Sequence, residues 1–324
     1  MKKISSANPR LLELNARIWI KRFGADCTLS SIPDEQITKW KERGFDMIWL
    51  MGVWDNNKEV INEYCFEPEL ISAYNSALKD WQKDDVIGSP YSIDRYDLNP
   101  LLGTKEDLIS FKKKLNDAGI SLILDFVCNH FSAKSSLIWT NKEIFLPADE
   151  FIFKNDPYTF YQSPANSKEY LAHGRDPLFP PWKDTAQINF YSREARNYLT
   201  SVLIELADLC DGVRCDMAML PLNNIFYNTW IGVLKKYGFE KPEKEFWEEA
   251  IAQVKIIRDD FIFIAETYWD LEWQLQNLGF DFTYDKRLTD RLVGGNIRSI
   301  KDHLSAEKTY QDKSVRFLEN HDED

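Results

Sequence analysis

Short apolar, β-branched segments alternate with helical patterns along this chain. The segments are 16–20, 46–50, 121–127, 211–215, 261–265, 279–283 and 314–318. They lack the apolar–polar alternation of a sheet with one wet face, so they predict parallel strands buried on both sides. Strand, helix and strand in repetition predict βαβ units.

Two of the intervening helices have clear boundary signals. Thr104 and Asp107 resemble a capping box ahead of an apolar stripe, and Gly119 ends that helix. A second helix is expected after Ser192, with apolar residues at helical spacing until the Asp-Gly pair before 213.

The number of strands favours a TIM (β/α)8-type barrel, whose eight units take about 250 residues. A long stretch after the third strand, rich in Pro, Asn, Asp, Tyr and Phe, lacks helical periodicity and predicts a small irregular subdomain inserted at the active-site end. The expected parts are 1–128 (first part of the barrel), 129–190 (inserted subdomain) and 191–324 (the barrel through strand 7). We find no segment for strand 8, so the barrel is expected to be truncated there.

Composition narrows the class of protein. Lys and Arg number 40 against 52 Asp and Glu, a net charge of −12, which argues against nucleic acid or an anionic membrane as a partner. We identify no apolar run of membrane-span length, and Glu13 and Arg17 interrupt the start, which makes a poor signal peptide, so a cytoplasmic location is expected. Five cysteines without CxxC spacing predict buried free thiols. The 11 tryptophans either pack the core or line a groove for sugar rings.

Charged and imidazole side chains gather at the ends of four predicted strands. Because active sites of (β/α) barrels form at the carboxyl ends of the strands, these residues are the candidates for chemistry. They are Asp125, Asn129 and His130 after the third strand, Arg214 and Asp216 at the fourth, Glu266 after the fifth, and His321 and Asp322 after the seventh.

These residue types suit glycoside hydrolysis with retention. Arg214 and Asp216 are two apart on a strand and face the same side, so the guanidinium would keep the carboxylate ionised for nucleophilic attack. Glu266 follows an apolar run, and desolvation there would favour a protonated general acid. Retaining enzymes need such a pair of carboxyl groups. Asp322 would stabilise positive charge in the transition state, and the two histidines would bond sugar hydroxyls.

A metal-dependent hydrolase would use many of the same residues. Its ligands would come from Asp125, His130, Glu266, His321 and Asp322. Only four histidines in the chain, and the cation of Arg214 beside the central carboxylate, weaken this alternative.

Taken together, four segments resemble the signature regions of the α-amylase superfamily, glycoside hydrolase family 13. They are DFVCNH (125–130), GVRCD (212–216), IAETYW (264–269) and FLENHD (317–322). The resemblance implies that Asp216 is the nucleophile, Glu266 the general acid/base and Asp322 the transition-state stabiliser. It also implies that Arg214, His130, His321 and Asp125 bind or support the substrate, and that Tyr91 is an aromatic platform for a sugar ring.

Two departures from the family concern specificity and calcium. Met219 and Leu220 stand where α-amylases usually carry a Lys-His pair on the acceptor side. Gln187 stands where the family has a calcium-binding aspartate, which leaves Asn129 as a weak calcium ligand. We therefore expect no required cofactor, with calcium as the alternative.

The expected activity is hydrolysis of α-glucosidic bonds in a neutral oligo- or polysaccharide by double displacement. Two alternatives stay open: a transglycosylase or isomerase of the same family, and a carbohydrate-binding fragment with impaired catalysis. Family members continue past strand 7 to an eighth strand and a C-terminal β-domain.

Overall fold

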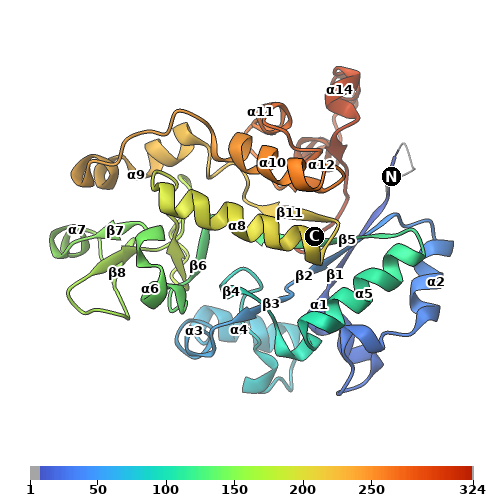
Figure 1. Ribbon diagram of the computed structural model, residues 1–324, viewed down its shortest axis with the longest axis horizontal. Helices are drawn as coiled ribbons and strands as arrows, with labels where there is room; N and C mark the ends of the chain where they lie inside the picture. The colour runs from blue at the N-terminus through green and yellow to red at the C-terminus, as the bar shows by residue number, and fades with distance from the viewer. Residues whose placement is uncertain (1–7, 323–324) are drawn as a thin grey trace.

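The computed structural model describes residues 8–322, and its centre is a parallel sheet of seven strands. The strands lie side by side in chain order (Figure 1), which is the order of a (β/α) barrel. They are β1 (Leu11–Asn15), β2 (Met47–Met51), β5 (Ser121–Val127), β11 (Gly212–Asp216), β12 (Ile262–Ala265), β13 (Phe282–Tyr284) and β14 (Ser314–Val315).

Helices and small sheets connect and flank these strands. The helices are α1 (Ala16–Trp19), α2 (Asp34–Glu42), α3 (Lys58–Tyr64), α4 (Pro68–Ala77), α5 (Lys105–Asp117), α6 (Leu137–Thr140), α7 (Glu150–Asn155), α8 (Arg193–Leu209), α9 (Asn223–Tyr237), α10 (Phe246–Ile257), α11 (Glu272–Asn277), α12 (Lys286–Val293), α13 (Ile297–Leu304) and α14 (Lys308–Gln311). The small antiparallel sheets pair β3 (Trp54–Asn56) with β4 (Ile93–Leu98), β6 (His130–Ser132) with β10 (Thr185–Gln187), and β9 (Tyr170–Ala172) with both β7 (Pro147–Ala148) and β8 (Phe160–Gln162).

Strand alternation divides the core into two layers. Residues of one parity, such as Leu124 and Val213, pack in the larger cluster with the helices. Residues of the other parity, including Trp49, Ile264 and Tyr284, form a second cluster on the inner side of the sheet. At the ends of the strands, side chains that belong to this second set therefore point to the inner side of the sheet.

The helix signals read from the sequence are confirmed. Thr104 and Asp107 form the reciprocal capping box of α5, and Gly119 follows that helix with a φ of 71°. Ser192 caps α8 by accepting a hydrogen bond from Ala195. Caps of this kind stabilise a helix by about 1 kcal/mol each.

The predicted strand at 16–20 is wrong. Ala16–Trp19 is the helix α1, and the first strand lies just before it. The Asn15 side chain accepts a hydrogen bond from the Ile18 N–H and so begins the helix. Ala16, Trp19 and Ile20 are buried at helical spacing, whereas Ile18 is 50% exposed, which a strand covered on both faces would not allow. The other six predicted strands overlap β2, β5, β11, β12, β13 and β14.

The sheet is open on one side. β1 and β14 are its edge strands, and they flank a cavity of about 960 Å³ lined by residues of β1, β2 and 311–321. Within residues 8–322 the barrel is thus incomplete, as expected from the strand count. The hydrogen bond between Glu13 on β1 and His321 spans this side at 2.6 Å.

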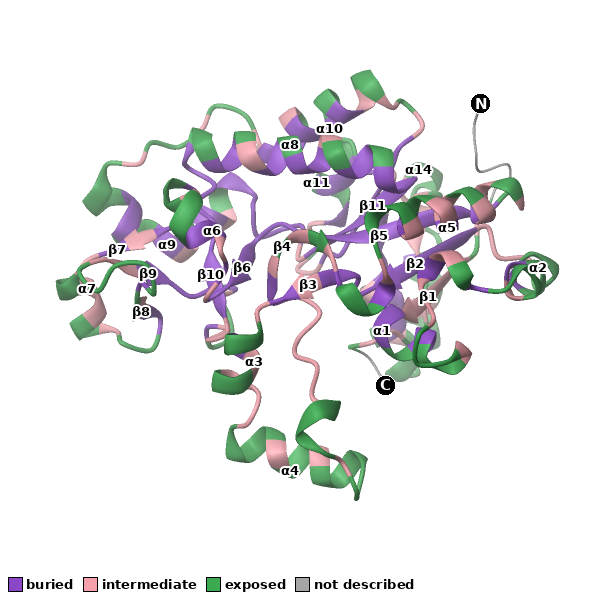
Figure 2. Ribbon diagram, turned by 60° about the horizontal axis from the view of Figure 1, so that its bottom comes forward, coloured by how far each residue is buried: buried purple, intermediate pink, exposed green. Residues whose placement is uncertain are grey.

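The long connection from β3 to β4 carries α3 and α4 away from the sheet. Figure 2 shows α4 standing apart, joined to the body by two connecting segments. None of its residues is buried.

All five cysteines are free, as predicted, although only Cys128, Cys210 and Cys215 are buried. Cys27 and Cys65 are half-buried. In the described part of the chain, no helix has the length and apolar character to cross a membrane.

Close strand packing around Gly212 gives a test of this core. A Cβ there would lie 2.6 Å from both the Cβ and the main-chain oxygen of Ile262. We predict that Gly212→Ala lowers the free energy of unfolding by about 1–3 kcal/mol. A Cβ at Gly232 in α9 would have no neighbouring atom within 4 Å. Gly232→Ala should therefore raise the free energy of unfolding by about 0.5–1 kcal/mol. Urea unfolding measures both, and equal midpoints would contradict the packing of β11 against β12.

Candidate active site

The strand register brings the predicted residues of three strands to one level. Arg214 on β11 pairs with Asp125 on β5 and with Ile264 on β12. Asp216 and Glu266 each lie two positions further along, so both face the inner side at the same height. All four polar side chains are buried.

Arg214 is the hub of this cluster. Its Nη1 lies 2.9 Å from Asp216 Oδ1 and 3.4 Å from Asp125 Oδ1. Its Nη2 lies 3.0 Å from Glu266 Oε2 in an ion pair. One guanidinium, itself 1% exposed, thus holds three buried carboxyl groups.

Aromatic rings enclose the guanidinium. The rings of Trp49, Tyr91 and Tyr284 have their centroids 5.0, 5.3 and 5.7 Å from the Arg214 Cζ. The Tyr284 hydroxyl accepts a hydrogen bond from Arg214 Nε at 3.2 Å. Such contacts stabilise a desolvated cation, so they fix the position of the hub. They also show that the predicted platform Tyr91 contacts Arg214.

Donors to Glu266 come from the turns after two strands. Met217 N–H donates to Glu266 Oε2 at 2.6 Å, and the Tyr268 hydroxyl donates to Oε1 at 2.9 Å. Met217 has a φ of 43°, and Trp269, after Tyr268, has a φ of 62°. Non-glycine residues with such backbone angles cost free energy and concentrate at functional sites.

Burial raises the pKa values of two carboxyl groups in the cluster. Burial, reinforced by the nearby Glu266, raises the pKa of Asp216 to about 8 despite Arg214. Burial raises the pKa of Asp125 to about 6, with Arg214 opposing the shift. With a pKa of about 8, the Asp216 carboxyl group holds its proton at neutral pH, and the ion pair with Arg214 limits this rise without reversing it.

His321 is held between two strands and the segment before β4. Its Nδ1 bonds Glu13 Oε1 at 2.6 Å, and its Nε2 lies 2.8 Å from the Tyr91 hydroxyl and 3.0 Å from Asp322 Oδ2. Burial would lower the pKa of His321, but the bonds to Asp322 and Glu13 outweigh it and raise the pKa to about 10. The ring is therefore an imidazolium. Asp322 reaches the cluster through His321, with its own side chain 53% exposed.

His130 lies at the edge of the cluster. Burial lowers its pKa to about 4, partly offset by a hydrogen bond to the main chain of Tyr91, so the ring is neutral. The ring packs beside Trp182, with centroids 5.2 Å apart. Neither of its contacts reaches Asp216 or Glu266.

Buried aromatic groups hold the strand ends that carry the cluster. Trp54 Nε1 donates to the carbonyl of Asp125 at 2.7 Å, and Tyr96 donates to that of Val127 at 2.8 Å. Trp247 Nε1 donates to the carbonyl of Ala218 at 2.7 Å. These bonds tie main-chain carbonyls at the end of β5 and just after β11 to side chains of other elements.

Sequence reasoning missed four members of the site: Glu13, Trp49, Tyr268 and Tyr284. The alternation of side chains along a strand could have identified Trp49 and Tyr284, because both lie at positions that point to the inner side of the sheet. Glu13 was hidden because the first strand was placed five residues late. Tyr268 carries no signal beyond lying two residues after Glu266.

The weak calcium-ligand candidate Asn129 bonds Gln187, which stands in place of the family's calcium-binding aspartate. Gln187 Nε2 lies within hydrogen-bond distance of three oxygens: Asn129 O and Oδ1, both at 2.9 Å, and Ile188 O at 3.0 Å. Gln187 and Asn129 are buried. An amide nitrogen surrounded by oxygens stands where a hard cation would need to be, so this donor set does not fit calcium.

The residues named for the alternative metal-dependent hydrolase also do not form a metal-binding group. Across residues 8–322, no group of three His, Cys, Asp or Glu side chains is arranged to hold a metal ion. The cation at the centre of the cluster is Arg214.

Comparison with known proteins places the chain in a family. The family model described as "Alpha amylase, catalytic domain" matches residues 34–324. The α-amylase MalA of Haloarcula japonica is 25% identical over 254 residues, which cover 74% of this chain and 32% of that protein. The α-amylase 2 of Dictyoglomus thermophilum is 28% identical over 239 residues, covering 71% and 36%. This chain thus spans about a third of those two relatives.

Solved structures share the fold. An α-amylase from Lactobacillus plantarum superposes with a TM-score of 0.62 at 21% identity, covering 98% of this chain and 64% of that one. The maltogenic α-amylase AmyB from Thermotoga neapolitana gives 0.64 at 21% identity, covering 99% and 61%. These likenesses confirm the barrel fold predicted from the strand pattern.

Gln187 offers a test of the metal question. We predict that a chelator leaves the melting temperature of the wild-type chain unchanged. Gln187→Asp removes the amide donor and should cost about 1–3 kcal/mol of stability in chelator, with part recovered on adding Ca²⁺. Gln162→Asp, at an exposed position of β8, is the matched control and should show no calcium effect. A lower melting temperature of the wild-type chain in chelator would contradict the conclusion that these residues do not bind calcium.

Proposed function

The chain belongs to the α-amylase catalytic-domain family, and from this premise we propose that it is a retaining glycosidase acting on α-glucosidic bonds of α-glucans or oligosaccharides. The observation that carries the proposal is the shared guanidinium. Asp216 and Glu266 bind neighbouring nitrogens of Arg214 and lie level on adjacent strands. A close carboxyl pair suits retention, since inverting enzymes need a wider gap for water.

The first half-reaction needs a proton on the Glu266 carboxyl group. Glu266 gives it to the glycosidic oxygen, Asp216 attacks the anomeric carbon, and the bond to the leaving group breaks. Burial raises the pKa of Asp216, so the mechanism requires Asp216 to lose its proton before it attacks. Met217 N–H can only donate to Oε2, so the acidic proton would sit on Oε1, where the Tyr268 hydroxyl is able to accept.

The second half-reaction reverses these roles. Glu266 takes a proton from water, the water oxygen attacks the anomeric carbon, and Asp216 leaves. Asp322 would stabilise the oxocarbenium-like transition states. Imidazolium His321 would donate to sugar hydroxyls, with Glu13 orienting its ring.

A neutral saccharide fits the charge of the site. Three carboxyl groups face one guanidinium, which disfavours an anionic substrate. Met219 and Leu220 are buried, so they offer no polar contact on the acceptor side.

Two substitutions test the assignment. We predict that Asp216→Asn and Glu266→Gln each lower turnover of 4-nitrophenyl α-glucoside by at least about 10²–10⁴-fold, because each removes a group that exchanges a bond or proton with the substrate. Circular dichroism should show the wild-type fold. Asp117→Asn, at a side chain 64% exposed on α5, is the control and should keep full activity. Substantial residual turnover in either site variant would refute the roles.

A further inference from the structure

A second cavity, of about 680 Å³, lies outside the strand-end cluster. It opens between α3 and α4 on one side and residues 181–184 on the other. Its volume is within the range of small-molecule sites. The roles proposed above leave it without a function.

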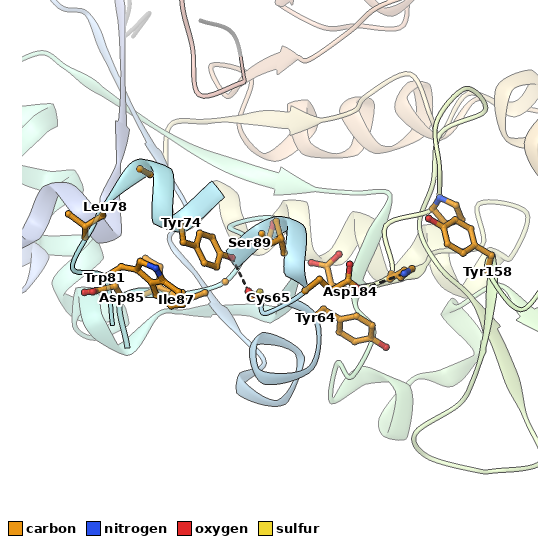
Figure 3. Close-up of a pocket in the computed structure, with 17 residues that line it drawn as sticks. Tyr64, Cys65, Tyr74, Leu78, Trp81, Asp85, Ile87, Ser89, Tyr158 and Asp184 are labelled. Carbon is orange, nitrogen blue, oxygen red and sulfur yellow. Dashed lines mark hydrogen bonds and ion pairs between the residues drawn. The ribbon is translucent and has the colours of Figure 1, made fainter. Parts of the chain in front are cut away.

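Aromatic side chains stand at both ends of this cavity. Figure 3 shows Tyr74 and Trp81 at one end, Tyr158 at the other, and Asp184 between them. Tyr158 is 51% exposed, and none of the residues of α4 is buried. The cavity is therefore elongated, with partly accessible aromatic side chains at each end.

The rings at the α4 end are fixed before any ligand arrives. The Tyr74 hydroxyl donates to the carbonyl of Cys65 at 3.0 Å, and Trp81 Nε1 donates to Asn75 Oδ1 at 2.8 Å. The two rings meet edge to face, with centroids 5.3 Å apart. A ligand that binds them would pay little conformational entropy.

The polar groups of the cavity favour a neutral, hydroxyl-rich ligand. Asp184 is half-buried at the centre, and no cationic side chain in the described part of the chain pairs with its carboxylate. Burial raises the pKa of Asp184. Lys183 is engaged by Glu67 at 3.5 Å and lies 5.2 Å from the Tyr158 ring centroid. An excess of acceptors excludes phosphorylated ligands and suits sugar hydroxyls.

We propose that this cavity is an accessory saccharide-binding site, in which an α-glucan chain lies across Trp81, Asp184 and Tyr158. The inference rests on the proposed function for the class of sugar. Aromatic faces pack against the apolar faces of sugar rings, and the central carboxylate accepts hydrogen bonds from hydroxyls.

The cavity is joined to the strand-end cluster through one short segment. Ser89 lines the cavity, and its hydroxyl accepts a hydrogen bond from the N–H of Tyr91 at 3.2 Å. Tyr91 in turn contacts Arg214 and His321. A saccharide long enough to occupy both the cavity and the strand-end cluster would thus bind better than a short one.

The test compares long and short ligands. In the Asp216→Asn background, which prevents turnover, maltohexaose binding is measured by calorimetry with and without Trp81→Ala. We expect an affinity loss of about tenfold, since the variant removes a stacking surface. Turnover of 4-nitrophenyl α-glucoside by Trp81→Ala with Asp216 intact should stay within about twofold of wild type, because that ligand is too short to reach the cavity.

Two further variants keep the test decisive. Tyr158→Ala removes the exposed ring at the other end and should weaken maltohexaose binding even where Trp81→Ala fails to fold. Trp139→Ala, at a tryptophan 54% exposed on α6, is the matched control and should change nothing.

The outcomes separate this inference from the proposed function. Normal turnover of the short glucoside, with maltohexaose binding equal in the Trp81, Tyr158 and Trp139 variants, overturns the accessory site alone. Binding that depends on Trp81 and Tyr158, in a chain that hydrolyses no α-glucoside, overturns the proposed hydrolysis and supports the site. Absence of both maltohexaose binding and turnover overturns both.

Discussion

One guanidinium facing three buried carboxyl groups is the constraint around which this molecule is organised. Arg214 contacts Asp125, Asp216 and Glu266 from the middle of the sheet, and three aromatic rings shield it from water. Uncompensated buried charges cost several kcal/mol each, so the site lowers its charge by retaining protons. The same imbalance that costs stability supplies the proton that an acid–base mechanism needs.

The aromatic residues that stood out in the composition serve this constraint more than they line a groove. Six tryptophans are buried: Trp19, Trp40, Trp49, Trp54, Trp230 and Trp247. Three of them act directly on the site, since Trp49 covers the guanidinium and Trp54 and Trp247 bond the carbonyls of strand ends. The ring pair of Tyr74 and Trp81 is the exception, because both side chains are only half-buried and lie outside the two core clusters.

Much of this arrangement could be predicted from the sequence, because parallel strands bring their carboxyl ends to one face. Asp125, Arg214, Asp216 and Glu266 were found in this way, and the register confirms that they meet. The segment 16–20 could not be placed, since four apolar residues around Arg17 suit a strand or a buried helical turn equally. Glu13 and the location of the proton depend on distances between strands and on burial, which no local pattern encodes. The segment around α4 could not be predicted, because none of the residues of this helix is buried and Tyr74 and Trp81 belong to neither core cluster.

The number of protons held by the carboxyl cluster is the most direct test of this account. Carbon-13 NMR titration of aspartate and glutamate side chains would follow each carboxyl group in the wild-type chain and in Asp216→Asn. The account predicts one carboxyl titration near pH 8, belonging to Asp216, that disappears in the variant. If every carboxyl group ionises below about pH 5, as in unperturbed side chains, Arg214 neutralises the cluster fully and the account is contradicted.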